Sequence, residues 1–104
     1  MIYCFDLDNT LCTQNGANYK EAKPIFNRIV IVNGLYDRGH TIKIFTGRGA
    51  TSGIDWKNVT ENQLRDWEIK YHELIIGSKP DAHYYIDDKA VFPNKFFNDN
   101  FNEE

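Results

Sequence analysis

Two carboxylates follow directly after a short apolar segment near the start of the chain. The apolar segment covers residues 2–5, and it is followed by Asp6, Asp8 and the hydroxyl of Thr10. Aspartate is unfavourable in strands, so two of them directly after an apolar run require an explanation. In an extended chain alternate side chains lie on the same side, so Asp6 and Asp8 are expected to point the same way. Such a pair suits a hard cation that takes oxygen ligands, or a carboxylate that attacks phosphorus.

The Asp-x-Asp pattern also has simpler interpretations. On its own it is common in solvated turns, and a short motif is only a hypothesis. A calcium loop of the EF-hand type is excluded by spacing. With Asp6 as its first residue, Leu11 stands where the loop needs glycine and Ala17 where it needs glutamate. The rest of the sequence is therefore needed to distinguish a catalytic or metal-binding pair of aspartates from a solvated turn.

Length, charge and composition limit the class of protein. The chain has 104 residues, of which 41% are hydrophobic and 26% charged, which is enough for one small globular domain. Its net charge of -3 offers no basic surface for nucleic acid, and no apolar run is long enough to cross a bilayer. The N-terminus lacks the basic region of a signal peptide. We therefore expect one domain over residues 1–104, in the cytoplasm, that binds neither nucleic acid nor membranes.

The cysteines do not indicate a disulfide framework or a zinc site. Cys4 and Cys12 are the only two in the chain, and no second pair accompanies them. Cys4 falls in the first apolar segment and is expected in the core.

Strand-forming and helix-forming segments alternate along the chain. The expected strands are residues 2–5, 41–45, 72–76 and 83–86. Polar or glycine-rich stretches at 12–23 and 47–57 are expected to be loops, the former a flap. The tail at 91–104 is rich in phenylalanine, so we expect part of it to pack on the domain or on a partner. This alternation predicts an α/β fold with a parallel sheet.

Two helices are expected between these strands. The first should open at Pro24, end near Gly39, and present an apolar face made of Ile25, Phe26, Ile29, Val30 and Tyr36. The β-branched run at 29–32 leaves a strand open as an alternative. For the second helix, Thr60 and Gln63 match a capping box at its start.

Polar side chains follow each expected strand. Thr46 follows the second strand, Lys79 the third, and Asp87 with Asp88 the fourth. Taken singly, such residues are more often a turn residue, a surface lysine and a helix cap. In a parallel sheet, however, all of them would meet Asp6 and Asp8 at one edge. Carboxylates this close need a compensating cation, so the set favours a divalent metal and an anionic substrate.

Several other features of the sequence do not indicate a catalytic role. The loop over residues 47–53 does not have the Walker pattern, and the three histidines lack metal-ligand spacing. Trp56 and Trp67 are expected to anchor the core or a loop. Arg48 is expected to be solvated, with contact to a substrate phosphate as the alternative.

Four segments, taken in order, resemble the motifs of the haloacid dehalogenase (HAD) superfamily: DLDNTL, FTGR, GSKP and YIDDK. Members of that superfamily are mostly Mg²⁺-dependent phosphatases with a Rossmann-like fold. The resemblance therefore implies a minimal three-layer α/β sandwich of this kind, with a mainly parallel sheet. The stretches IDWKNVTENQL, KYHELIIG and YIDDKA further resemble small members linked to capsule and surface-polysaccharide biosynthesis. Two features depart from the pattern: the lysine loop reads Gly-Ser-Lys-Pro where Gly-Lys-Pro is expected, and the chain lacks a cap domain.

The resemblance also implies roles for single residues. Asp6 would be the nucleophile that forms an aspartyl-phosphate, and Asp8 the general acid and then base. Thr46 and Lys79 would contact the transferring phosphoryl group. The remaining substrate contacts would come from Asn9, Gly47 and Arg48. The Mg²⁺ ligands would be drawn from Asp6, Asp8, Asp87 and Asp88, and the resemblance does not decide which of the last two binds directly.

The expected activity is hydrolysis of a small phosphomonoester, such as a phosphorylated sugar or a related metabolite. A phosphotransferase or phosphomutase with the same intermediate is one alternative, and a non-catalytic binding or regulatory domain is another. Both Asp6 and Asp8 are present, which favours catalysis. Without a cap, specificity must come from the flap at 12–23, from the loop at 47–57, or from a partner copy in a homo-oligomer.

Overall fold

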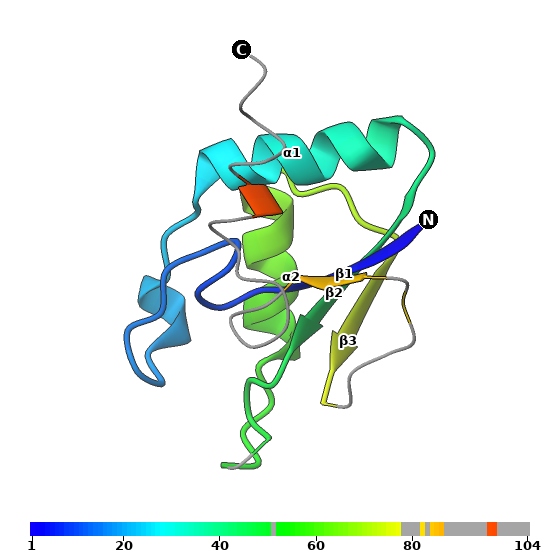
Figure 1. Ribbon diagram of the computed structural model, residues 1–104. Helices are drawn as coiled ribbons and strands as arrows, with labels where there is room; N and C mark the ends of the chain where they lie inside the picture. The colour runs from blue at the N-terminus through cyan, green and yellow to red at the C-terminus, as the bar shows by residue number, and fades with distance from the viewer. Residues whose placement is uncertain (51, 78–81, 83, 87–95, 98–104) are drawn as a thin grey trace.

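The computed structural model describes residues 1–50, 52–77, 82, 84–86, 96 and 97. Strands and helices alternate along this part of the chain (Figure 1). In chain order the elements are β1 (Ile2–Asp6), the 3₁₀ turn η1 (Tyr19–Glu21), α1 (Phe26–Asp37), β2 (Thr41–Thr46), α2 (Lys57–Asp66), β3 (Glu73–Ile76) and β4 (Tyr84–Ile86).

The strands form one parallel sheet with the order β3-β2-β1-β4. Strand β1 lies inside the sheet, where Phe5 pairs with Ile44 on one side and with Ile86 on the other. The chain moves outward from β1 to β2 to β3 and then returns to the far side of β1. In open α/β sheets, ligands bind beside the carboxyl ends of the strands at such a reversal. The predicted α/β class and parallel sheet are confirmed, and the end of β1 is the expected position of a site.

One face of the sheet carries the core. Ile42, Ile44 and Thr46 are buried at alternate positions of β2, and the register places Tyr3 and Phe5 of β1 beside the two isoleucines. Both helices contribute buried residues to the same cluster, namely Ile29, Val32, Leu35 and Leu64. In Figure 1, α1 lies across the top of the view with α2 below it. The sheet and this helical layer are the parts of the predicted sandwich that the described residues show.

Part of the phenylalanine-rich tail packs on this core. Phe97 is 2% exposed, and its ring stacks on Phe5 with centroids 6.1 Å apart. Phe96 meets the rings of Phe5 and Tyr3 edge-on. The expected packing of the tail is confirmed for these two residues, while Phe92 and Phe101 lie outside the described residues.

Helix α1 differs from its prediction at the start. It begins at Phe26, because Pro24 instead forms an extended bridge with Cys12. Phe26 and Val30 are exposed, at 61% and 63%, so their predicted place on the apolar face is wrong. Ile29 is buried as predicted, and Val32 and Leu35 are buried with it. The β-branched run is helical, since this buried stripe outweighs the local preference for strand.

The end of α1 was predicted correctly. Gly39 has a φ of 93°, a left-handed conformation that glycine adopts readily. The N–H groups of Gly39 and His40 donate to the carbonyls of Tyr36 and Leu35. This is the Schellman pattern, which satisfies carbonyls that the helix end leaves free.

Helix α2 begins at Lys57, three residues before the predicted cap at Thr60. The predicted capping box is therefore wrong, and both of its residues lie inside the helix. Among the described residues, no helix is long and apolar enough to span a membrane. No cap domain is found in the part of the chain that the structure describes.

Candidate functional site

The chain turns sharply after β1, and two half-buried aspartates, Asp6 and Asp8, lie where the turn begins. Leu7 is fully buried, and its N–H donates to the Phe45 carbonyl at 3.0 Å, which extends the pairing with β2. The Leu7 carbonyl then accepts the N–H groups of three residues, Thr10, Leu11 and Cys12. Asn9 has a φ of 65°, a left-handed conformation that asparagine tolerates. Leu7 thus fixes the turn from inside, with Asp6 and Asp8 on either side of it.

An open pocket of about 260 Å³ lies at this edge, and we call it the acidic pocket. Its lining includes five of the residues predicted for the site: Asp6, Asp8, Asn9, Gly47 and Arg48. Gln14, Tyr19 and Phe45 complete the lining. The Asp6 carboxylate accepts the N–H of Leu7 at 3.0 Å, and the Asn9 amide donates to the Gln14 side chain at 2.9 Å. The structure therefore brings together these predicted residues from two separate loops.

Arg48 forms a two-pronged ion pair with Asp8. Its Nη2 lies 2.8 Å from Oδ1 of Asp8, and its Nε lies 3.0 Å from Oδ2. The Arg48 side chain is 0% exposed and that of Asp8 is 13% exposed. A bidentate pair of this kind fixes the plane of the carboxylate.

The remaining nitrogen of Arg48 is held by α2. Its Nη1 donates to the Thr60 hydroxyl at 3.1 Å and to Oε1 of Gln63 at 2.7 Å. Nη2 also lies 3.9 Å from the Cys12 sulfur, so each guanidinium nitrogen has a protein partner. The expectation that Arg48 is solvated is wrong. Thr60 and Gln63 look like a capping box in the sequence, but they serve as acceptors for Arg48.

Thr46 also positions Asp8. Its hydroxyl donates to Oδ2 of Asp8 at 3.2 Å and accepts the N–H of Arg48 at 3.1 Å. Thr46 is completely buried. The predicted contact between Thr46 and a phosphoryl group stays a prediction, and so does substrate binding by Arg48.

A buried thiol lies beneath the same carboxylate. The Cys12 sulfur is 3.6 Å from both the Leu7 carbonyl and Oδ1 of Asp8. Burial, and next the negative charge of Asp8, raise the pKa of Cys12 to about 12. The thiol is therefore protonated near neutral pH and acts as a weak donor, not as a nucleophile. Cys4 is buried in β1, as expected, and Cys12 is buried as well.

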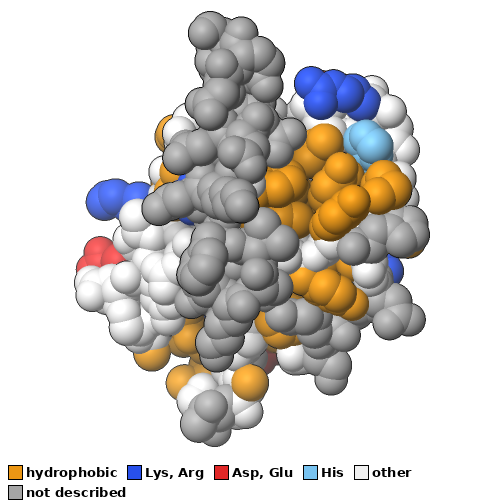
Figure 2. Space-filling view, in the orientation of Figure 1, with side chains coloured by type: hydrophobic (Ala, Val, Ile, Leu, Met, Phe, Trp, Pro, Cys, Tyr) orange, Lys and Arg blue, Asp and Glu red, His pale blue; other side chains and the backbone are white. Residues whose placement is uncertain are grey.

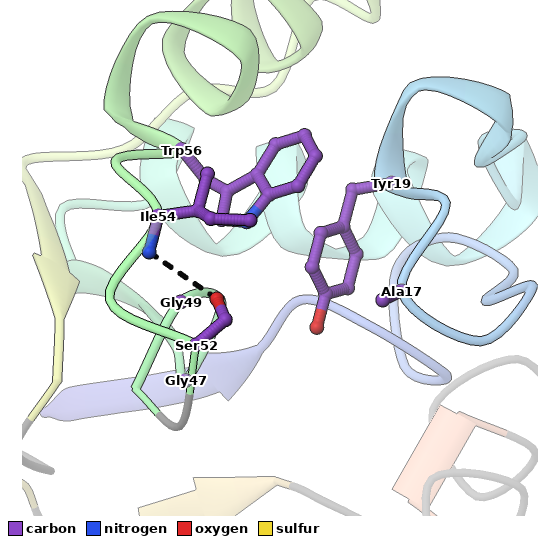
Figure 3. A pocket seen from close by; sticks show the side chains of 7 residues that line it. All are labelled: Ala17, Tyr19, Gly47, Gly49, Ser52, Ile54 and Trp56. Carbon is purple, nitrogen blue, oxygen red and sulfur yellow. Dashed lines mark hydrogen bonds between the residues drawn. The ribbon is translucent and has the colours of Figure 1, made fainter.

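A second hollow adjoins the acidic pocket (Figure 3). It measures about 240 Å³ and is lined by Ala17, Tyr19, Gly47, Gly49, Ser52, Ile54 and Trp56, and we call it the aromatic pocket. Tyr19 and Gly47 line both pockets. The Tyr19 ring also lies against Arg48, with the guanidinium carbon 4.7 Å from the ring centroid. Sequence reasoning gave Tyr19 no role, because only its position in the flap hinted at the site.

The predicted flap is held by hydrogen bonds at its base and near its tip. At its base, the Thr13 N–H donates to the Lys23 carbonyl at 2.8 Å, and the Lys23 N–H donates to the Thr13 hydroxyl at 3.0 Å. Near its tip, the Gln63 amide donates to the Tyr19 carbonyl at 2.7 Å. Gln63 thus holds the flap and Arg48 at once.

Three predicted site residues, Lys79, Asp87 and Asp88, lie outside the described residues. Strand β4 ends at Ile86, which pairs with Phe5, and Asp87 is the next residue in the sequence. Within the described ranges, no group of three or more metal-ligating side chains is found. The donors present at the end of β1 are carboxylate and carbonyl oxygens, which suit Mg²⁺ rather than a softer metal.

Comparisons with known proteins identify the fold. No family model matches the chain, and no curated protein matches it. An MCSG target from Vibrio cholerae is similar in structure, with a TM-score of 0.74 and 27% identity over 93% of this chain and 88% of that one. Two structures of a Pnkp1/Rnl/Hen1 complex, one described as an RNA repair complex, give TM-scores of 0.61 and 0.60 with 18% and 19% identity. Each match covers 95% of this chain but 34% and 31% of the longer chains, so this chain shares its fold with about a third of each.

Proposed function

We propose that this protein is a Mg²⁺-dependent phosphomonoester hydrolase of the HAD superfamily. One observation carries the proposal. Asp6 and Asp8 lie at the carboxyl end of the inner strand β1, line one open pocket, and differ in how they are held. The likeness to chains of the Pnkp1/Rnl/Hen1 complex is compatible with a phosphoryl-transfer enzyme of this kind.

Asp6 is the nucleophile in this proposal. The N–H of Leu7 binds Oδ1 of Asp6 at 3.0 Å and orients the carboxylate. A carboxylate oxygen attacks phosphorus, the new oxygen–phosphorus bond forms, and the ester bond to the leaving group breaks. The phosphoryl group is then carried by Asp6.

Asp8 supplies and removes the proton. In the first step it gives a proton to the departing oxygen, and in the second it takes one from the water that attacks the aspartyl-phosphate. That attack releases inorganic phosphate and restores Asp6. The hydrogen bonds from Arg48 and Thr46 fix the Asp8 carboxylate in the lining of the acidic pocket. Its role requires accurate placement, since misplacement by about 1 Å can cost about 10²-fold in rate.

The oxygen donors at this edge fit Mg²⁺. Asp6, the backbone carbonyl of Asp8, and Asp87 would hold the ion, with Asp88 as a further ligand or as support for one. When bound, Mg²⁺ supplies charge neutralisation for the transferring phosphoryl group. Lys79 would add a second positive charge at the same group.

Hydrolysis is preferred over transfer to a second substrate for two reasons. The acidic pocket is open, so water reaches Asp6, and Asp8 is available as a base for that water. The resemblance to small capless members makes a phosphorylated sugar of capsule or surface-polysaccharide biosynthesis the proposed substrate.

Phosphate release from para-nitrophenyl phosphate in Mg²⁺ tests this proposal. Wild-type protein should turn the ester over, and the Asp6→Asn variant should not. Asp66→Asn is the matched control, because Asp66 is an exposed aspartate at the end of α2. Activity that survives Asp6→Asn, or that falls equally in Asp66→Asn, would contradict the assignment.

A further inference from the structure

The aromatic pocket is lined without a single charged side chain among the described residues. Its walls include the rings of Tyr19 and Trp56, whose centroids lie 5.0 Å apart with planes at 85°. Ile54 and Ala17 add apolar surface. Figure 3 shows both rings beside the space between the flap and the loop that carries Ser52. A lining without charged side chains suits a neutral group better than a phosphate.

Part of the pocket is formed by glycines, so backbone is accessible there. Gly49 has a φ of 81°, and a Cβ at this position would come 2.1 Å from the Ile54 carbonyl oxygen. Glycine at this position is therefore needed for the loop to close on itself. A Cβ added at Gly47 would meet nothing within 4 Å, so open space for a ligand lies beside this residue. Hydroxyl groups of Ser52 and Tyr19 add polar atoms to this surface.

The two pockets are neighbours across Tyr19 and Gly47, which line both. A phosphate in the acidic pocket would therefore carry its organic part toward or into the aromatic pocket. The two linings fit such a molecule, because the acidic pocket has carboxylates and Arg48 whereas the aromatic pocket has neutral rings.

We propose that the aromatic pocket binds the organic part of the substrate, and that this part is a single neutral sugar ring. The inference rests on the proposed function and adds the place where the organic part of its substrate binds. A sugar ring has one apolar C–H face and a polar edge, which match an aromatic wall beside hydroxyl and backbone groups. A planar base is held best between parallel rings, whereas Tyr19 and Trp56 meet at nearly a right angle. The volume of about 240 Å³ suits one ring rather than a chain of them.

Kinetics with paired substrates provide the first test. Glucose 1-phosphate carries a sugar ring, while acetyl phosphate is too small to reach Trp56. Ala17→Trp should fill the pocket, and Trp56→Ala should remove a wall. Each should raise KM for glucose 1-phosphate roughly threefold to tenfold, with little change for acetyl phosphate. Trp56→Phe should restore most of the loss. Phe26→Ala, an exposed aromatic on α1, is the control and should change neither substrate.

The kinetic result overturns the inference if both substrates lose the same factor, or if glucose 1-phosphate loses none. The sugar assignment is also overturned if a mononucleotide has a lower KM than glucose 1-phosphate and this KM rises in the same variants. The pocket would then bind a nucleobase.

Binding to the Asp6→Asn variant provides a second test that does not need turnover. Glucose 1-phosphate in Mg²⁺ should change the tryptophan fluorescence of this variant. Adding Trp56→Phe should abolish the change, because the other tryptophan, Trp67, does not line this pocket. Acetyl phosphate should give a smaller signal. If wild-type protein hydrolyses neither compound but the fluorescence change is present, the proposed function fails while the binding pocket stands. If turnover is normal and no change is seen, the pocket assignment fails by itself.

Discussion

The two neighbouring pockets are built in opposite ways. In the acidic pocket Asp8 is held by several side-chain hydrogen bonds, and its main partner Arg48 is bound in turn by Thr60 and Gln63. In the aromatic pocket the side chains contribute ring surface, and the hydrogen bond drawn in Figure 3 is local, from the Ile54 N–H to the Ser52 hydroxyl.

This difference matches the demands of the two proposed tasks. Phosphoryl transfer needs charged groups held in place before the substrate arrives, since reorganisation would add to the barrier. Recognition of a neutral ring needs contact area, and a loop that adapts is sufficient for that. Tyr19 is shared, because its ring lies against Arg48 on one side and against Trp56 on another. The predictions below separate the two pockets, from the largest expected effect to the smallest.

Asp6→Asn should have the largest effect. An amide does not attack phosphorus, so kcat should fall by at least about 10⁴-fold, while the far-ultraviolet circular dichroism spectrum stays unchanged. The same variant should still bind ligand in the aromatic pocket. A loss of both properties would mean that the two pockets are not separable.

Removal of metal should silence the acidic pocket alone. EDTA should abolish turnover, and added Mg²⁺ should restore it. Ca²⁺ should inhibit, since it accepts looser and higher coordination and disturbs in-line geometry. Steady-state assays with buffered metal check this, and full activity without metal would contradict the roles given to Asp6 and Asp87.

Asp8→Asn should slow the enzyme by about 10²- to 10⁴-fold, and the loss should depend on the leaving group. A sugar hydroxyl needs a proton as it departs, whereas nitrophenolate leaves without one. Transfer to Asp6 should therefore survive better with the nitrophenyl ester, giving a burst of nitrophenol and then slow turnover. Equal losses for both esters in single-turnover experiments, with no burst, would remove Asp8 as the acid.

Arg48→Met should damage both rate and stability. It leaves the partly buried Asp8 carboxylate without its ion-pair partner, which we expect to cost about 3 kcal/mol in the free energy of unfolding. Arg48→Lys should retain charge but lose the bidentate geometry, and so stabilise less than arginine does. Thermal unfolding measures the loss of stability in both variants, and steady-state assays measure the loss of rate. Thr60→Val serves as control, because it removes one of several acceptors and should cost about 1 kcal/mol.

Gly49→Ala should disturb the aromatic pocket with the smallest overall effect. The new methyl group meets the Ile54 carbonyl and is strained at a φ of 81°, which we expect to cost about 1–3 kcal/mol. Gly53→Ala is the matched control, since Gly53 has a similar φ of 77° but a Cβ added there would meet nothing within 4 Å. Its cost should be limited to about 1 kcal/mol of backbone strain. If Gly49→Ala lowers kcat for acetyl phosphate as well, the aromatic pocket is not independent.

The sequence predicted the strand ends better than the helix starts. Asp6, Asp8 and Arg48 meet because parallel strands bring their carboxyl ends together, and topology decides this regardless of side-chain detail. Thr60 and Gln63 misled the prediction because a capping box and two acceptors on one helix face have the same spacing. Only the buried position of Arg48, which depends on tertiary packing, tells them apart.

The aromatic pocket could not be predicted for a similar reason. Tyr19 and Trp56 are 37 residues apart in the sequence, and their contact depends on the flap and on the loop after β2. Neither loop has a periodic pattern from which its path could be derived. The prediction that Phe26 and Val30 are buried was wrong for the same reason. Which face of α1 is buried depends on the elements that α1 packs against.

The most direct test of the central claim is to trap the phosphoryl group on Asp6. The Asp8→Asn variant is mixed with para-nitrophenyl phosphate and Mg²⁺ in a single turnover, quenched in acid, and digested for peptide mass spectrometry. We predict that the N-terminal peptide gains the mass of one phosphoryl group at Asp6, and that the gain is lost when Asp6→Asn is added. A burst of nitrophenol with no phosphoryl group at Asp6, or with the group on another residue, would contradict the account.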